Sequence, residues 1–318
     1  MAEENNDFAL VLTGGGARAA YQVGFLRGLS RQFPDLHFSI LTGVSAGAIN
    51  AAYIANHSGS FAEAIDDLAG LWSELVVEKV FRADPWSLVK SVFGWGAALL
   101  SGGAVKAPAA RGLVDTTPLH RLLDTRMAAT EGVLRGVGEN LRRGRLKALA
   151  ITGTKYGTSQ ALTWVQGKGI ETWERPHRRS VQTEICTAHV MASAALPLFF
   201  PAIRVGDAWY GDGGIHQRAL EVINFLLEKV PREDVKPLRP VELFLLRPSR
   251  NLSQEAHRFE ARLPGMFRFL TRGLGTKQTE SPDWLSMVLF DPDYLNLLMR
   301  IGEEDAEARR EDFAARLG

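Results

Sequence analysis

The sequence is short of the features that mark several protein classes. It has a single cysteine, Cys186, among 318 residues, which excludes an intramolecular disulfide framework and a zinc site built from several cysteines. Basic and acidic side chains nearly cancel, 37 against 36, so no overall positive charge attracts nucleic acid, and we expect no such partner. The hydrophobic share of 46% and the charged share of 23% exclude a disordered or fibrous chain.

Signals for export and for membrane insertion are also missing. The first residues, MAEENNDFALVL, are acidic and polar, whereas a secretory signal peptide begins with basic residues and a long apolar run. Segments 36–62 and 185–203 lack charged side chains, but glycine and asparagine interrupt the first, and Pro197 and Pro201 interrupt the second. We therefore expect both segments to be buried core and the protein to be cytoplasmic.

The first sixty residues predict a strand followed by a helix, twice in succession. The apolar run 8–13 ends in three glycines and is followed by apolar residues at helical spacing over 17–33. The run 38–42 leads through Gly43 into a helix whose alanines would let it lie close to a sheet. This alternation is typical of an α/β fold in which helices cover a mainly parallel sheet.

The rest of the chain continues as helices and strands without a repeat or an obvious linker. We therefore expect one domain over 1–318, with a core over roughly 8–250 and a helical C-terminal extension over roughly 251–318. Further strands are predicted at 146–152, 159–166, 209–211 and 241–246, and helices at 61–75, 118–123, 131–143, 254–262, 266–274, 284–301 and 303–317.

Segment 84–112 mixes tryptophan and phenylalanine with several glycines. Two interpretations stay open for it. It could form a lid or a surface that docks on lipid aggregates, or it could be a loop packed against the core.

Residues 43–47, GVSAG, fit the pattern G-x-S-x-G between a predicted strand and a predicted helix. Gly43 and Gly47 permit a sharp turn, which would lift the Ser45 hydroxyl over the sheet at the start of a helix. The pattern alone is common, and a plain turn with a capping serine is the alternative. The strand-to-helix context favours a nucleophile elbow with Ser45 as the nucleophile.

Gly14, Gly15 and Gly16 end the preceding predicted strand and also open a helix. Their amides could hold an oxyanion beside Ser45, because neighbouring parallel strands bring both loops to one sheet edge. The same glycines partly fit a dinucleotide-binding loop, but no acidic residue ends the second strand to bind a ribose, and no Walker lysine follows. We therefore favour an oxyanion hole and expect no cofactor.

Asp212 is the best candidate for the base, because glycines follow it and could turn its carboxylate into the crevice at the strand ends. An aspartate that only closes its own turn is the alternative. His216 is near enough in sequence to keep a Ser-His-Asp triad open. The other histidines fall in no catalytic or metal-ligand pattern, and we expect no metal: His37, His57, His120, His177, His189 and His257.

The motifs GGGAR, GVSAG, SAALPLFFP and DGG, in this order, resemble the patatin-like phospholipase family. The resemblance implies a three-layer α/β/α sandwich and a dyad of Ser45 and Asp212 that needs no metal or cofactor. It also implies an oxyanion hole in Gly14, Gly15 and Gly16, with Arg18 in the family's basic position beside it. The implied substrate is a lipid or another fatty-acyl ester, so peripheral contact with a membrane is compatible with it.

Two departures from the family pattern affect which family properties can be assigned to this chain. Ala19 stands where a glycine is usual, and residues 215–219, IHQRA, replace a frequent Asn-x-Pro element after Asp212. The second departure leaves a catalytically weak or inactive lipid-binding protein as the alternative function. Head group, acyl-chain length and oligomeric state are not determined by the sequence.

Overall fold

The computed structural model describes residues 8–82, 112, 114–197, 199–213, 244–262 and 283–317. Several predictions lie outside these residues. They are the segment 84–112 except Gly112, the histidine at 216 and its neighbours 215–219, residues 241–243, and the helix 266–274.

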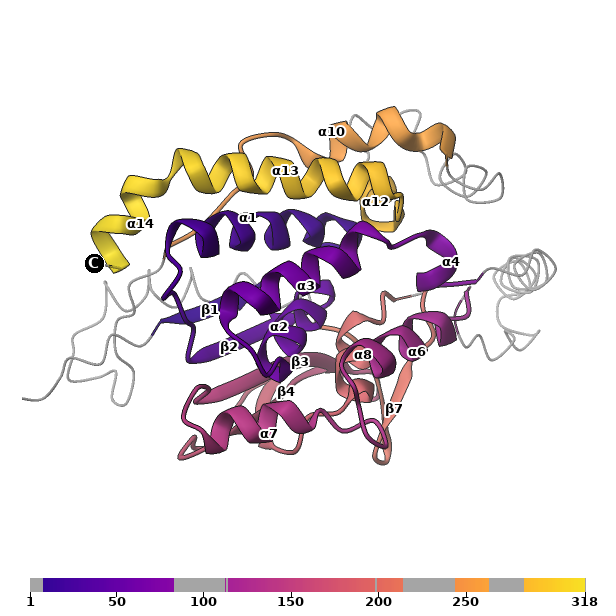
Figure 1. Ribbon diagram of the computed structural model, residues 1–318. Helices are drawn as coiled ribbons and strands as arrows, with labels where there is room; N and C mark the ends of the chain where they lie inside the picture. The colour runs from indigo at the N-terminus through magenta and orange to yellow at the C-terminus, as the bar shows by residue number, and fades with distance from the viewer. Residues whose placement is uncertain are drawn as a thin grey trace, which may run out of the picture.

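Eight described strands form one sheet with the order β1-β2-β3-β4-β6-β5, and β8 pairs with β3 and with β7. In Figure 1, β1 to β4 run through the middle of the molecule. The strands are β1 (Ala9–Leu12), β2 (Ile40–Val44), β3 (Ala148–Lys155), β4 (Gln160–Gly167), β5 (Glu174–Arg175), β6 (Arg178–Gln182), β7 (Ile203–Val205) and β8 (Ala208–Asp212).

The strand and helix alternation predicted for the N-terminus is confirmed, and β1, β2 and β3 run parallel. β4 and β6 are also parallel, whereas β3–β4, β3–β8, β5–β6 and β7–β8 are antiparallel. The sheet is therefore mixed within the expected α/β fold. The reason is local: residues 156–159 between β3 and β4 are too few for the crossover that a parallel pair needs.

The helices pack on the sheet and on one another. α2 contacts β2 and β3, α8 contacts β3 and β8, and α13 lies along α1 above the sheet in Figure 1. The described helices are η1 (Gly16–Arg18), α1 (Ala19–Gln32), α2 (Ala46–Asn56), α3 (Phe61–Ser73), α4 (Val77–Val80), α6 (Thr117–Arg126), α7 (Arg135–Arg142), α8 (Thr187–Ala194), α10 (Leu252–Ala256), η3 (His257–Arg262), α12 (Asp283–Val288), α13 (Pro292–Ala308) and α14 (Arg310–Leu317).

The predicted boundaries of the C-terminal helices are wrong. The helices break at position 309 and before Pro292, where the Asp291 carboxylate caps α13 by accepting hydrogen bonds from two backbone amides. Gly302, taken as the break, lies inside α13, and a Cβ there would come within 2.3 Å of the Tyr21 carbonyl oxygen of α1. Glycine is needed at 302 for the close approach of two helices. Residues 244–246, predicted to end a strand, are not in one.

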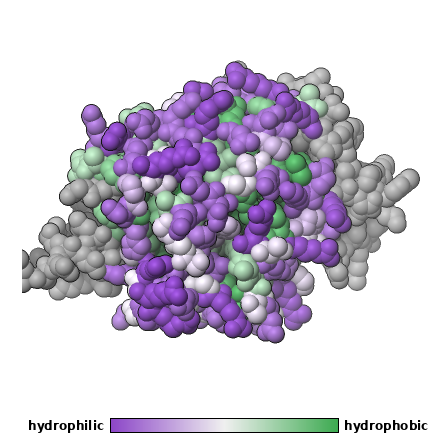
Figure 2. Space-filling model, in the orientation of Figure 1, coloured by the Kyte–Doolittle hydropathy of each residue, from purple (hydrophilic) through white to green (hydrophobic). Residues whose placement is uncertain are grey.

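Burial follows the sequence pattern in both uncharged segments. Ala48, Ala51 and Ala52 on α2 are fully buried, as small residues facing a sheet should be. None of the helices in the described part of the chain combines the length and apolar character needed to cross a bilayer. The face shown in Figure 2 is mostly hydrophilic, with hydrophobic residues in small groups.

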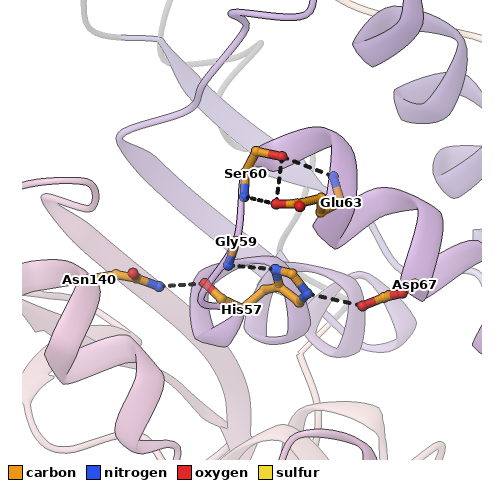
Figure 3. A network of polar contacts seen from close by, with 6 residues as sticks. All are labelled: His57, Gly59, Ser60, Glu63, Asp67 and Asn140. Carbon is orange, nitrogen blue, oxygen red and sulfur yellow. Dashed lines mark hydrogen bonds and ion pairs between the residues drawn. The ribbon is translucent and has the colours of Figure 1, made fainter.

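The C-terminal end of α2 is tied to two other helices by a polar network (Figure 3). Ser60 caps α3 and forms a reciprocal capping box with Glu63, whose pKa is lowered by hydrogen bonds from the Ser60 backbone and side chain. His57 accepts a hydrogen bond from the Gly59 amide at 3.0 Å, and Asn140 of α7 donates to the His57 carbonyl at 2.8 Å. The helix that begins beside Ser45 is thereby fixed at its far end.

The burial of His189 predicts that the stability of the folded protein depends on pH. Burial lowers the pKa of its imidazole from 6.5 to about 4, and Nδ1 accepts a hydrogen bond from the Cys186 amide at 3.0 Å. The unfolded chain binds a proton on this ring below pH 6.5, whereas the folded chain does so only near pH 4. The free energy of unfolding is therefore expected to fall by about 3 kcal/mol as the pH drops through this window.

Urea unfolding at pH 7 and at pH 4.5 measures most of this loss. His189→Gln should reduce the difference between the two pH values, whereas His257→Gln, on an exposed histidine, should leave it unchanged. Equal pH dependence in both variants would contradict the assignment to His189.

Candidate active site

Ser45 occupies a tight turn between β2 and α2. Its backbone has φ 57° and ψ −132°, an unfavourable conformation for a residue with a side chain, and the residue is 3% exposed. The flanking glycines are needed for close packing: a Cβ on Gly43 would lie 2.4 Å from the Gly47 carbonyl oxygen, and one on Gly47 would lie 2.2 Å from the Leu12 carbonyl oxygen. The turn predicted by the GVSAG pattern is therefore present, between a strand and a helix.

The glycine loop lies beside this turn. β1 and β2 are parallel, with Leu12 opposite Gly43, so the residues that follow both strands emerge at the same edge of the sheet. A Cβ on Gly14 would lie 2.9 Å from the Ser45 Cβ. The structure thus brings the two predicted loops into contact, with the loop leading into η1 and α1.

Arg18 connects the glycine loop to the C-terminal helices. Its Nε donates to the Gly15 carbonyl at 3.5 Å and its Nη1 donates to the Ser253 hydroxyl at 3.3 Å, which in turn contacts the Ser286 hydroxyl at 3.2 Å. The loop is therefore linked to α10 and α12, far along the chain. No local pattern around Ser253 or Ser286 could have revealed this link.

Asp212 approaches Ser45 from the opposite direction along β3. β4 covers one edge of β3 over its whole length, so β2 and β8 share the other edge. β2 is paired up to Val44, opposite Thr152, and β8 arrives antiparallel with Asp212 opposite Gly153. The backbones of Ser45 and Asp212 thus lie at the same level of the sheet, although 167 positions separate them in sequence.

The backbone of Asp212 is held by two hydrogen bonds, and the residue is only 7% exposed. Its amide donates to the Ala195 carbonyl at 2.9 Å, and its carbonyl accepts from the Thr154 hydroxyl at 2.9 Å. The pKa of the neighbouring Tyr156 is raised mainly by burial of its hydroxyl, and the negative charge of Asp212 raises it further.

Ser193 of α8 is a site residue to which the sequence pattern gave no role. Its hydroxyl accepts a hydrogen bond from the Ser45 amide at 2.9 Å and donates one to the Thr152 carbonyl at 2.6 Å. It lies in the SAALPLFFP run, but only the tertiary structure brings that run next to the turn at Ser45.

An apolar cavity of about 40 Å³ opens at Ser45. Among the described residues that line it, Ser45 alone bears a hydroxyl, and the glycine loop contributes Gly16. The walls come from distant segments, including Trp72 of α3, Leu122 of α6 and Met287 of α12. The arrangement places a hydroxyl at the boundary of a space suited to a hydrocarbon group.

None of the described histidines lines this cavity. Across the described ranges, no three or more histidine, cysteine or carboxylate side chains gather as they would to hold a metal ion. The residue at 216 lies outside those ranges, so the triad alternative is not tested.

A family model described as patatin-like phospholipase matches residues 10–221. VipD from Legionella pneumophila is 16% identical, with a TM-score of 0.39 over 66% of this chain and 46% of that one. The type III effector ExoU is 19% identical, with a TM-score of 0.31 over 60% of this chain and 40% of that one. ExoU in its complex with SpcU from Pseudomonas aeruginosa is 16% identical, with a TM-score of 0.32 over 96% of this chain and 52% of that one.

This chain thus spans about half, or less, of the length of these structures. No curated protein matches it.

Gly16 is expected to be intolerant of a side chain. Its φ is +56°, and an added Cβ would lie 2.1 Å from the Met287 carbonyl oxygen. Gly16→Ala should lower the free energy of unfolding. Backbone strain alone accounts for about 1–3 kcal/mol, and the steric clash adds to it. Gly70→Ala is the control, because Gly70 is an exposed residue inside α3 with no atom within 4 Å of an added Cβ. Urea denaturation should show Gly70→Ala to be unchanged or stabilised, and equal stability of both variants would refute the constraint.

Proposed function

We propose, because the chain belongs to the patatin-like phospholipase family, that it hydrolyses carboxylic esters of lipids through a dyad of Ser45 and Asp212. The position of Ser45 carries this proposal: it borders an apolar cavity, lies against Gly14 of the glycine loop and follows a strand that ends at the level of Asp212. A hydroxyl, a carboxylate and backbone amides are the groups that acyl transfer needs.

In the first half of the reaction, the Asp212 carboxylate accepts the Ser45 proton as the Ser45 oxygen attacks the ester carbonyl carbon. Amides of the glycine loop, Gly14, Gly15 and Gly16, donate hydrogen bonds to the oxygen that becomes negatively charged. The carbon–oxygen bond to the alcohol then breaks, and the alcohol leaves with the proton from Asp212. The product is an ester between the acyl group and Ser45.

In the second half, water attacks the acyl-serine and gives its proton to Asp212. The Ser45 oxygen leaves as the carboxylic acid forms, and the proton on Asp212 returns to it. The cavity supports a fatty-acyl substrate, because it would remove the hydrocarbon chain from water while the ester stays beside Ser45.

Removing either member of the dyad should nearly abolish turnover. Ser45→Ala removes the nucleophile, and Asp212→Asn removes the base, so hydrolysis of a soluble p-nitrophenyl ester should fall at least about 10²-fold in each. Asp207→Asn is the control, because this exposed carboxylate lies in the β7–β8 turn of the same hairpin.

Labelling by a fluorophosphonate should disappear in Ser45→Ala and persist with a chelator present. A folded Ser45→Ala protein with full activity would exclude the mechanism, and an unmodified protein that never labels would favour the lipid-binding alternative.

Filling the cavity should change selectivity for the acyl chain. Leu122 lines the cavity and is half-buried, so Leu122→Trp is expected to fold and to shorten the space for a chain. The ratio of kcat/KM for p-nitrophenyl decanoate to that for the acetate should fall by about 10-fold or more. Leu297→Trp, on a half-buried leucine of α13 outside the cavity, should leave the ratio unchanged. An unchanged ratio in Leu122→Trp would show that the chain binds elsewhere.

A further inference from the structure

The regular hydrogen bonding between β2 and β3 stops where the chain turns at Ser45. Ser39 lies just before β2, and its carbonyl accepts hydrogen bonds from the amides at the start of the β3 segment. Because successive residues of a strand bond to opposite sides, the odd-numbered residues of β2 direct their backbone N–H and C=O groups toward β3. If β2 continued to position 45 in the same pattern, the Ser45 amide would donate a hydrogen bond to the Thr152 carbonyl. The turn prevents the direct bond, and a buried amide cannot be left without a partner at no cost.

The Ser193 hydroxyl stands between the two groups that the turn separates. It accepts from the Ser45 amide at 2.9 Å and donates to the Thr152 carbonyl at 2.6 Å, so one side-chain oxygen replaces the missing bond between the strands. The side chain is 0% exposed and lies in the last turn of α8. Water therefore does not compete for this bridge.

The same end of α8 also holds the segment that carries Asp212. Two residues after Ser193, the Ala195 carbonyl accepts the hydrogen bond of the Asp212 amide at 2.9 Å. One short stretch of chain is therefore bonded to the backbone of both members of the proposed dyad. A shift of this stretch changes the distance between the Ser45 oxygen and the Asp212 carboxylate.

We propose that Ser193 is a positioning residue for the nucleophile: its hydroxyl fixes the strained backbone of Ser45 and so aims the Ser45 oxygen at Asp212. The inference rests on the proposed function, because it concerns the geometry of the same dyad. Ser193 itself touches no reacting atom and acts only through the Ser45 amide. Small errors in the alignment of reacting groups cost rate rather than binding, so the effect belongs in kcat.

The test compares Ser193→Ala with Ser193→Cys. Alanine removes the bridge and leaves a small space, whereas cysteine fills the space but is a weak donor and a weak acceptor. If the bridge matters, both variants should lose about 10- to 100-fold in kcat on a soluble p-nitrophenyl ester, with KM within about twofold of the unmodified protein. If Ser193 only fills volume, Ser193→Cys recovers the activity that Ser193→Ala loses, and the proposal is overturned.

Ser30→Ala is the matched control. Ser30 is also a buried serine on a helix, and its hydroxyl donates to the Arg27 carbonyl, but it lies on α1 and does not line the cavity. It should keep full kcat, measured well below the thermal unfolding midpoint of every variant. An equal loss of kcat in Ser30→Ala and Ser193→Ala would show that the effect comes from general destabilisation, and it would overturn the proposal.

The rate of Ser45 labelling by a fluorophosphonate separates this inference from the function on which it rests. Labelling is expected to slow in both Ser193 variants and to stay unchanged in Ser30→Ala. An unmodified protein that does not label would refute the Ser45 mechanism itself. An unmodified protein that labels on Ser45, together with Ser193→Ala labelling at the same rate, would refute only the role of Ser193.

Discussion

Ser45 joins β2 to α2 with a positive φ, and a residue with a side chain keeps such a conformation only where its surroundings fix it. Three neighbours do so here. Gly14 lies against the serine Cβ, and Ser193 holds its amide. α2 begins at the next residue, and its far end is anchored by Asn140, which donates a hydrogen bond to the His57 carbonyl. The energy stored in the turn is balanced by burial and hydrogen bonds contributed by several separate segments.

The C-terminal helices belong to the site as much as the N-terminal strands do. α13 packs along α1, where the Tyr21 hydroxyl donates to the buried Asp305 carboxylate at 2.8 Å. This packing brings α12 over the glycine loop, so that the Met287 backbone leaves no room for a side chain at Gly16. The matched family region ends at residue 221, yet residues from α12 form one wall of the cavity.

Local patterns predicted much of the first part of the molecule. The two strand and helix units, the turn at Ser45 and the burial of the alanine face of α2 follow from glycine positions and hydrophobic spacing, which act over a few residues. The predicted break at Gly302 fails because a glycine inside a helix can serve a contact with another helix, and spacing along one chain carries no sign of that contact. The mixed sheet was missed for a similar reason, because pairing direction depends on how a short connection folds back.

The sequence by itself determined which residues could do chemistry: a serine in a glycine turn, a glycine loop before it, and an aspartate followed by glycines. Only the tertiary structure decided where the strands that carry them end, because β2, just before Ser45, and β8, at Asp212, reach one level of β3 from opposite ends. It also revealed Ser193 and the contacts of Arg18 with α10, which no local pattern marks. Local sequence fixes backbone preference over a turn or a helix, whereas the meeting of distant segments depends on how their apolar faces pack together.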